Sequence, residues 1–257
     1  MSSDIILETR KLTKEFKGFV AVDQVDLTVR RGTIHALIGP NGAGKTTCFN
    51  LLTKFLKPTS GAILFNGTDI TGETPAHIAR RGIIRSFQIS AVFPHLTVLE
   101  NVRVALQRKL GTSFHFWRPE SSLKTLDARA LELLGSVDLA DAAQSLTADL
   151  SYGRKRSLEI ATTLAMEPEL MLLDEPTQGM GLEDVDRIRR LIKQVAANRT
   201  VLMVEHNMSV VASIADTITV LQRGATLAEG PYEVVSANPA VIEAYMGSAA
   251  TELVGAH

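Results

Sequence analysis

The sequence predicts an α/β fold in which a parallel β-sheet forms the core and an antiparallel β lobe lies beside it. Three observations lead to this prediction. Short runs at 34–38, 170–173 and 200–204 are almost wholly apolar, as strands buried on both faces of a parallel sheet are. Near the N-terminus apolar and polar residues alternate, which is typical of strands with one solvated face. From Thr97 to about Leu146 helical patterns dominate.

Size and composition are those of a globular protein. The chain has 257 residues, of which 45% are hydrophobic, enough for one large α/β domain or two small ones. Lys and Arg (27) nearly balance Asp and Glu (28), so we expect no nucleic-acid partner. The single cysteine, Cys48, excludes an intrachain disulfide and is expected to pack in a helix, in a reducing compartment. No apolar run approaches the length of a membrane span, so a membrane role would require a partner protein.

The first part of the chain is expected to form the antiparallel lobe. Strands are predicted at 5–12 and at 25–29, where apolar residues alternate with polar ones. A run at 62–65 is followed by Asn66 and Gly67, a dipeptide that suits a two-residue hairpin turn.

A glycine-rich loop follows the first buried run. The sequence GPNGAGKTT at 39–47 fits the pattern GxxxxGK[ST], which cradles phosphate groups. Glycines allow backbone conformations that other residues avoid, so successive N–H groups can converge on phosphate oxygens at the start of the following helix, expected at 46–55. The alternative is a glycine-rich turn beside an unrelated lysine, but the order strand, loop, helix favours the phosphate cradle.

The loop residues have distinct expected roles. Lys45 should reach the β- and γ-phosphates, and the Thr46 hydroxyl should bind a Mg²⁺ ion that bridges them. Thr47 is expected to cap the helix. The nucleotide-binding residues predicted from this loop are Gly39, Pro40, Asn41, Gly42, Ala43, Gly44, Lys45, Thr46 and Thr47.

Two side chains outside the loop are candidates for the same site. Phe16 lies between the first strands, where an aromatic ring could stack on a purine, or could be a core or surface phenylalanine. Gln88 follows a candidate strand at 83–87, and its amide oxygen could lie near the metal. Taken alone, a loop glutamine is usually just polar.

The helical region has three notable features. Thr97 and Glu100 fit a capping box at a helix start. Apolar residues between Leu126 and Val137 share one helical face, which is most simply core packing. A cluster of aromatic residues could dock a partner or cover a satellite core; it consists of Phe114, Phe116 and Trp117.

The later buried runs end in polar residues that could bind a metal or take part in catalysis. The run at 170–173 leads into Asp174 and Glu175, which places two carboxylates at the carboxyl edge of a parallel sheet, where α/β proteins bind ligands. Such a pair suits a metal and a general base. The run at 200–204 leads to His206, although a histidine at a strand end has a structural role more often than a catalytic one.

The remaining elements follow from local signals. LSYGR at 150–154 precedes a helical pattern, with Ser151 as the expected N-cap. A hairpin at 217–229 and a short helix at 239–246 are expected near the C-terminus. Residues 248–257 are expected to form a flexible tail.

Taken in order, these motifs resemble those of the ATP-binding-cassette (ABC) ATPases. The set comprises the loop at 39–47, Gln88, LSYG at 150–153, the strand and carboxylates at 170–175, and His206. Its most diagnostic part is the Ser-x-Gly signature, which other phosphate-loop enzymes lack. Within the family the chain is similar to the ATPase subunits of branched-chain amino-acid importers, through LSYG, VEHNM at 204–208 and EAYMG at 243–247.

The resemblance implies a P-loop NTPase core with a parallel sheet, an antiparallel β lobe and a helical subdomain that carries the signature motif. Residues 1–247 would form a single nucleotide-binding domain, with the helical subdomain at about 96–165. ATP and Mg²⁺ would be the ligands, and the activity would be ATP hydrolysis coupled to transmembrane transport.

The resemblance also implies a role for each site residue. Asp174 would hold Mg²⁺ through water, Glu175 would orient and deprotonate the attacking water, and His206 would contact the γ-phosphate. Gln88 would sense metal and partner together. Because cassettes of this family dimerise head to tail, Ser151 and Gly153 would complete the nucleotide site of the opposite subunit.

The partners implied are transmembrane permease subunits, a second cassette in a homo- or heterodimer and, indirectly, an extracytoplasmic solute-binding protein. The chain would work at the cytoplasmic face of the inner membrane. Within the family a lipid or polysaccharide exporter subunit is the alternative. A cassette ATPase acting on ribosomes or DNA would usually carry tandem cassettes or long coiled-coil insertions, and a small-molecule phosphotransferase would not need the signature.

Two positions depart from the family pattern. Arg154 replaces the usual glutamine of the signature, and Gly181 stands where many relatives carry an aspartate. Both lie toward the dimer interface, which predicts that the chain by itself is largely monomeric and a slow ATPase. In the alternative, Arg154 donates a tolerated hydrogen bond and Gly181 is harmless.

Overall fold

The computed structural model describes residues 4–86, 92–107 and 125–254, with side chains through Met246. Its central element is a six-stranded sheet in the order β11-β10-β4-β9-β8-β7. The strands from β10 to β7 are parallel, and β11 pairs with β10 in antiparallel fashion. The bounds are β4 (Ile34–Ile38), β7 (Ile83–Ser86), β8 (Leu170–Asp174), β9 (Thr200–Val204), β10 (Thr217–Gln222) and β11 (Ala225–Gly230).

A second, antiparallel sheet has the order β2-β1-β5-β6, with β3 also paired to β1. Its strands are β1 (Ile5–Phe16), β2 (Phe19–Val25), β3 (Thr28–Arg30), β5 (Ser60–Phe65) and β6 (Thr68–Asp69). The predicted hairpin at Asn66 and Gly67 is confirmed, because β5 and β6 pair and both turn residues have positive φ. The α/β class, with a parallel core and an antiparallel lobe, is confirmed.

The single strand predicted at 25–29 was wrong. Val25 ends β2 and Thr28 begins β3, and both strands pair with β1. The break has a local cause: Lys11 of β1 has a φ of 47°, and its N–H donates to Asp26 Oδ1 at 2.6 Å instead of to a strand partner. The predicted alternation of buried and exposed side chains nevertheless holds from Val25 to Arg30.

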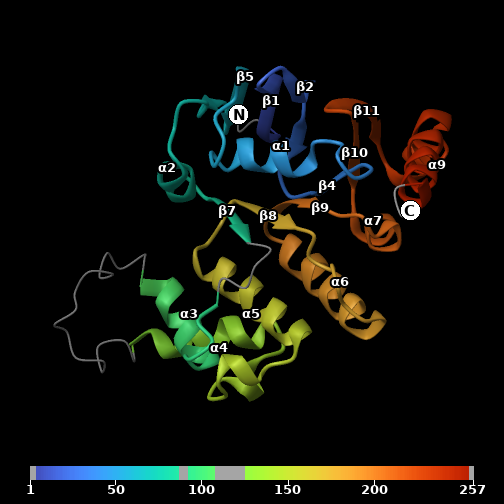
Figure 1. Ribbon diagram of the computed structural model, residues 1–257. Coiled ribbons are helices and arrows are strands. Elements are labelled where there is room, and N and C mark those ends of the chain that lie inside the picture. Colours follow the sequence, from blue (N-terminus) through green and yellow to red (C-terminus); the bar gives the residue numbers. More distant parts are fainter. Residues whose placement is uncertain (1–3, 87–91, 108–124, 255–257) are drawn as a thin grey trace.

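Helices cover the six-stranded sheet, and α3, α4 and α5 gather on the side away from the antiparallel lobe (Figure 1). The described residues between 96 and 165 form helices and their connections. The bounds are α1 (Lys45–Leu52), α2 (Pro75–Arg80), α3 (Val98–Gln107), α4 (Asp127–Gly135), α5 (Tyr152–Ala165), α6 (Leu182–Ala196), α7 (Met208–Ile214), α8 (Tyr232–Ser236) and α9 (Pro239–Val254), with short 3₁₀ turns at Ala140–Ala142 and Thr147–Asp149. Helix α9 thus runs past the predicted end at Met246, while the mobility of 248–257 stays a prediction.

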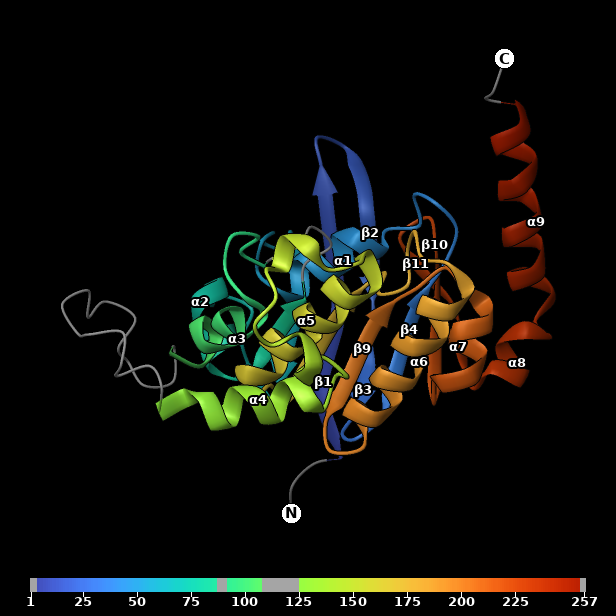
Figure 2. The same ribbon diagram turned by 90° about the horizontal axis from the view of Figure 1, so that it is seen from below.

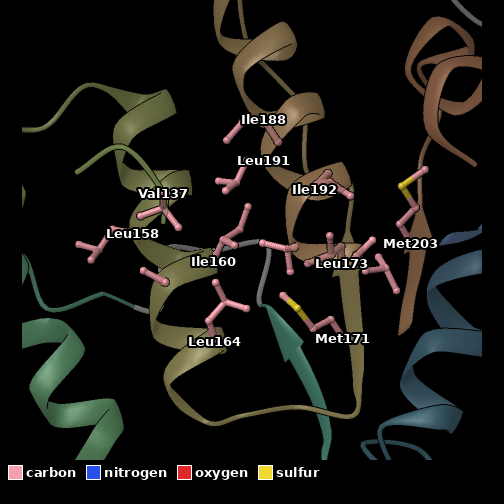
Figure 3. Packing of buried hydrophobic residues seen from close by; sticks show 14 of the residues in the cluster. Val137, Leu158, Ile160, Leu164, Met171, Leu173, Ile188, Leu191, Ile192 and Met203 are labelled. Atoms are coloured by element: carbon pink, nitrogen blue, oxygen red, sulfur yellow. The ribbon is translucent and has the colours of Figure 1, made fainter. Parts of the chain in front are cut away.

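The six-stranded sheet is buried on both faces, which explains its continuous apolar runs. Along β8, Leu170 and Leu172 pack toward α1 and the antiparallel sheet, whereas Met171 and Leu173 pack toward the helical side. Figure 3 shows the helical side, where Leu173 lies among side chains of α5 and α6. The core therefore holds the carboxyl ends of the strands rigidly in place.

Local packing predictions are also confirmed. Thr97 N donates to Glu100 Oε2 at 2.6 Å and Glu100 N donates to Thr97 Oγ1 at 3.2 Å, which is a capping box. The apolar stripe around α4 is buried in the core from Ala130 to Val137. Cys48 is fully buried, and burial raises the pKa of its thiol to about 12, so it is a packing residue.

Candidate nucleotide-binding site

Sheet order and register bring the predicted motifs together. Strands β4, β9 and β8 are neighbours, and Leu37, Val204 and Asp174 align in one row across them. The loop after β4, the residues after β9 and the carboxylates after β8 therefore leave the sheet at the same carboxyl edge. Segments more than a hundred residues apart in the chain meet there.

The phosphate loop has the conformation that its glycines allow. Gly42 and Gly44 have φ of 76° and 101°, a region that side chains disfavour. At Gly44 a Cβ would also lie 2.5 Å from the Ala21 carbonyl oxygen of β2, so only glycine fits. The absence of a side chain at Gly44 therefore lets the loop pack closely against β2 of the antiparallel sheet.

Helix α1 begins with an uncapped, electropositive N-terminus. Gly44 is the N-cap and offers no side chain, and the first turn, all of it described, contains no acidic residue. Its first N–H groups, from Lys45 onward, have no acceptors within the helix. The prediction that Thr47 caps the helix was wrong, because the helix starts at Lys45 and Thr47 lies inside the first turn. An uncapped helix start on a glycine loop fits a phosphate group.

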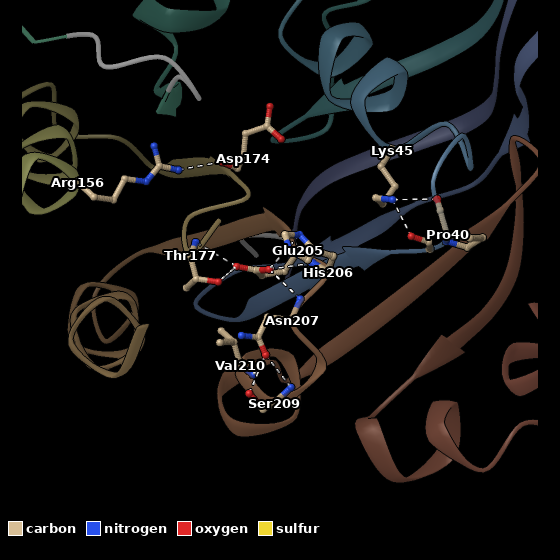
Figure 4. Close-up of polar contacts among 11 residues, drawn as sticks. Pro40, Lys45, Arg156, Asp174, Thr177, Glu205, His206, Asn207, Ser209 and Val210 are labelled. Atoms are coloured by element: carbon tan, nitrogen blue, oxygen red, sulfur yellow. Dashed lines mark hydrogen bonds and ion pairs between the residues drawn. The ribbon is translucent and has the colours of Figure 1, made fainter. Parts of the chain in front are cut away.

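Lys45 lies inside the loop rather than in solvent. Its Nζ donates to the carbonyl oxygens of Gly39 at 2.6 Å and Pro40 at 3.0 Å (Figure 4). Burial lowers the pKa of Lys45, and the nearby Glu175 carboxylate acts in the opposite direction. The cation is therefore fixed at the loop and lies within electrostatic reach of the carboxylate after β8.

Oxygen ligands for a metal lie on two neighbouring elements. Asp174 is 2% exposed at the end of β8, and Thr46 is an exposed residue in the first turn of α1. Arg85 connects the two elements: Nη2 pairs with Asp174 Oδ2, and Nη1 donates to Asn50 Oδ1 at 2.7 Å. Asn50 stands four residues after Thr46 and so shares its helical face. The described residues contain no group of three or more acidic, His or Cys side chains that could hold a metal. One carboxylate and one hydroxyl fit Mg²⁺, which takes its other ligands from phosphates and water.

Glu175 has an unusual backbone for a non-glycine residue. Its φ is 44°, and its N–H donates to the Val204 carbonyl oxygen at 2.9 Å. A left-handed residue held by the neighbouring strand is typical of functional positions, where surrounding structure stabilises the strain. The half-buried carboxylate lies within electrostatic reach of Lys45.

Glu205 was not predicted to matter, yet it organises this edge (Figure 4). Its fully buried carboxylate accepts from Thr177 N and Oγ1 through Oε1, and from the backbone N–H groups of His206 and Asn207 through Oε2. It therefore fixes both the turn after Glu175 and the start of the segment that carries His206. A charged residue at the end of a buried run was the sequence signal.

His206 itself is directed outward. Its side chain is 54% exposed, and its Nδ1 lies 3.8 Å from Glu205 Oε2. Its backbone is held, but the ring is left accessible at the carboxyl edge. The arrangement suits contact with a ligand.

Helix α5, which carries the signature motif, is hydrogen-bonded to the same carboxyl edge of the sheet. The predicted N-cap is confirmed, since Ser151 Oγ accepts from Arg154 N at 3.4 Å. A Cβ at Gly153 would lie 2.3 Å from Asp184 Oδ1 of α6, so any larger residue would require the Asp184 side chain to move. Arg156 Nη2 donates to the Asp174 carbonyl oxygen at 2.8 Å, which links α5 to the end of β8. Arg154 pairs with Asp141 Oδ1 at 2.5 Å, within its own subdomain.

Of the other predicted residues, only Phe16 lies within the described part of the chain. Phe16 ends β1 at the tip of the β1–β2 hairpin, 41% exposed, with Lys14 Nζ 5.0 Å from its ring centroid. Its stacking on a purine stays a prediction. Gln88 and the aromatic cluster of Phe114, Phe116 and Trp117 lie outside the described residues.

Tyr245 of α9 reaches the phosphate loop from the C-terminal side. It packs against the core on the helical side of the sheet. Burial raises the pKa of its phenol to about 12, while the nearby Gly39 backbone acts in the opposite direction. The phenol of the last helix therefore lies close to the first glycine of the phosphate loop.

Comparison with known proteins agrees with this geometry. The family model described as ABC transporter matches residues 22–178, and the model described as branched-chain amino acid ATP-binding cassette transporter matches residues 225–251. The chain is 41% identical to the high-affinity branched-chain amino acid transport ATP-binding protein BraF of Pseudomonas aeruginosa, over 95% of this chain and 98% of the relative. It is 39% identical to LivG of Escherichia coli, a protein of the same description, over 96% of this chain and the whole relative.

A solved structure gives the same result for the fold. The ADP conformation of an ATP-binding cassette of an ABC transporter superimposes with a TM-score of 0.83 and 30% sequence identity, covering 95% of this chain and 99% of the other. Together with a phosphate loop, a strand-end carboxylate pair and a signature helix joined at one sheet edge, these matches establish the family. The chain belongs to the ABC transporter family, as an ATP-binding cassette that hydrolyses ATP.

Proposed function

We propose that this cassette is the ATP-hydrolysing subunit of an importer for branched-chain amino acids. The observation that carries the proposal is that residues 225–251, which form β11, α8 and most of α9, match the family model of branched-chain amino acid ATP-binding cassette transporters. The similarity to BraF and LivG along nearly the whole chain supports the same solute class.

Each residue of the site has a chemical task in this proposal. The N–H groups at the start of α1, with Lys45, bind the β- and γ-phosphates of ATP. Asp174 and Thr46 would hold Mg²⁺, which when bound neutralises charge on those phosphates. Glu175 accepts a proton from the attacking water, and His206 contacts the γ-phosphate from the exposed edge. Gln88 would report the occupancy of the site to a partner.

The proposed assembly is a head-to-tail pair of cassettes beneath two permeases, at the cytoplasmic face of the membrane. The N-terminus of α5, with Ser151 and Gly153, would donate to the nucleotide of the opposite cassette. None of the described helices has the length and apolar character that crossing a membrane requires. Permease subunits would therefore provide the path for the solute, and an extracytoplasmic binding protein would deliver it.

Solute import is tested by reconstitution. The chain is expressed with a companion cassette, permeases and a solute-binding protein of such an importer, and the complex is placed in liposomes. We expect ATP-dependent uptake of labelled leucine, isoleucine and valine, with unlabelled amino acids of other classes competing poorly. A complex that forms and hydrolyses ATP but transports none of the three would refute the solute assignment.

The partner cassette is tested by the ATPase rate. Arg154 is already paired with Asp141, which favours a tolerated substitution at that position, whereas Gly181 leaves the N-cap of α6 without a side-chain acceptor. We expect the chain alone to be a slow ATPase, with a rate that rises roughly tenfold or more when companion and permeases are added. Arg154→Gln is expected to change neither rate. A fast rate that rises steeply with the concentration of this chain alone would exclude the need for a companion.

A further inference from the structure

Arg85 is a charged residue in the middle of a buried strand. Its neighbours in β7, Ile83, Ile84 and Ser86, are all buried, and its own side chain is only 10% exposed. Burying a guanidinium group is costly unless its donors are matched by acceptors. The acceptors that Arg85 contacts therefore indicate the role of the cation at this position.

The guanidinium group connects its own strand, β7, to β8 and to α1. Nη2 pairs with Asp174 Oδ2 at the end of β8, and Nη1 donates to Asn50 Oδ1 of α1 at 2.7 Å. Its Cζ also lies 5.9 Å from the centroid of the Phe49 ring, on the same helix. The planar fork of arginine can hold two acceptors in a fixed relative position, which the single ammonium group of lysine cannot do.

These contacts fix the carboxylate from one side. Oδ2 of Asp174 is engaged by Arg85, and the Asp174 backbone carbonyl is engaged by Arg156. The orientation of the carboxylate group is thereby restricted, and Asn50, which Arg85 also contacts, shares a helical face of α1 with Thr46. Hydrogen bonds of this kind to a metal-binding carboxylate orient it for the ion.

We propose that Arg85 is a positioning residue for the Mg²⁺ site. It orients the Asp174 carboxylate and holds the end of β8 in a fixed position relative to α1, the helix that carries Thr46. The inference rests on the proposed function, in which Asp174 holds Mg²⁺. Through Arg85, strand β7, which precedes Gln88 in the sequence, contacts the carboxylate proposed to hold the metal. Arg85 itself does not touch the nucleotide.

Arg85 could also have the opposite effect on Mg²⁺ binding, and the experiment must distinguish the two. A guanidinium group and a divalent cation repel each other, so Arg85 could compete with Mg²⁺ for Asp174. Under competition, removal of Arg85 would tighten Mg²⁺ binding. Under positioning, removal would weaken it, because the buried carboxylate would lose its orientation and its compensating charge.

The experiment measures binding rather than turnover. ADP affinity of the full chain is determined by calorimetry in EDTA and at increasing Mg²⁺ concentrations. For Arg85→Met we expect ADP affinity in EDTA to stay within about twofold of the wild type, while the Mg²⁺ concentration for half-maximal enhancement rises roughly tenfold or more. Arg85→Lys, which retains the charge and therefore the fold but spans only one acceptor, should show an intermediate rise.

Arg103→Met is the matched control. Arg103 pairs with Asp127 at 2.5 Å in the helical subdomain and is similarly buried, but it is remote from Asp174. We expect its Mg²⁺ dependence to equal that of the wild type. An unchanged or lowered half-maximal Mg²⁺ concentration in both Arg85 variants would overturn the positioning role. Failure of the wild type to bind ADP under any condition would instead overturn the proposed nucleotide site.

Discussion

Lys45→Ala is expected to weaken ATP binding by about 100-fold, on the scale of losing charge-assisted hydrogen bonds worth about 3 kcal/mol. The variant loses the cation that, in the proposed function, faces the β- and γ-phosphates, and also the hydrogen bonds from Nζ to the Gly39 and Pro40 carbonyl oxygens. Equilibrium binding of a fluorescent ATP analogue to the purified chain measures the effect directly.

Lys54→Ala is the control for loss of a buried lysine. Lys54 is 7% exposed, and burial lowers its pKa to about 8, but it lies beyond the end of α1 and outside the phosphate loop. We expect its ATP affinity to stay within about threefold of the wild type. Equal affinity of wild type and Lys45→Ala would remove Lys45 from the assigned role.

Glu175→Gln is expected to slow hydrolysis by roughly 10² or more, the usual scale for losing a general base, while ATP binding is retained. The amide keeps the size of the side chain but cannot accept the proton of the attacking water. With ATP bound and not hydrolysed, paired cassettes should accumulate. Single-turnover hydrolysis and size-exclusion chromatography with ATP measure the two effects.

Glu169→Gln provides a matched comparison at the opposite end of the same strand. Glu169 precedes β8 and pairs with Arg31 at 3.3 Å, on the surface. Its loss removes a carboxylate without approaching the carboxyl edge, so hydrolysis should be unchanged. If Glu175→Gln turned over as fast as Glu169→Gln, the general base would have to be sought elsewhere.

The sequence predicted well what depends on neighbours in the chain. The strand, glycine loop and helix at 34–52 follow from a local pattern, and so do the Asn66-Gly67 hairpin and the Thr97 capping box. Motif order was enough to identify the family, because several specific patterns recur in one order. Two of the errors, at Thr47 and at 25–29, were also local: each depended on which backbone hydrogen bonds the neighbouring residues make.

Contacts between distant segments could not be predicted in this way. Arg85 lies 35 residues from Asn50 and 89 from Asp174, and Glu205 lies 28 from Thr177. Each charge stands within or beside a buried run, so its sequence indicated that a partner was needed. Which partner it finds is decided by the strand order β4-β9-β8-β7, a property of the whole sheet that no local pattern contains.

Because Tyr245 lies close to Gly39, the two ends of the described chain differ as places to attach a tag or label. In Figure 2 the start of β1 lies at the opposite end of the molecule from the end of α9. An affinity tag or fluorophore joined before β1 would sit far from the nucleotide. One joined after α9 would extend a helix whose phenol lies close to the first glycine of the phosphate loop. A C-terminal label is thus suited to reporting the state of the loop, and an N-terminal one to purification.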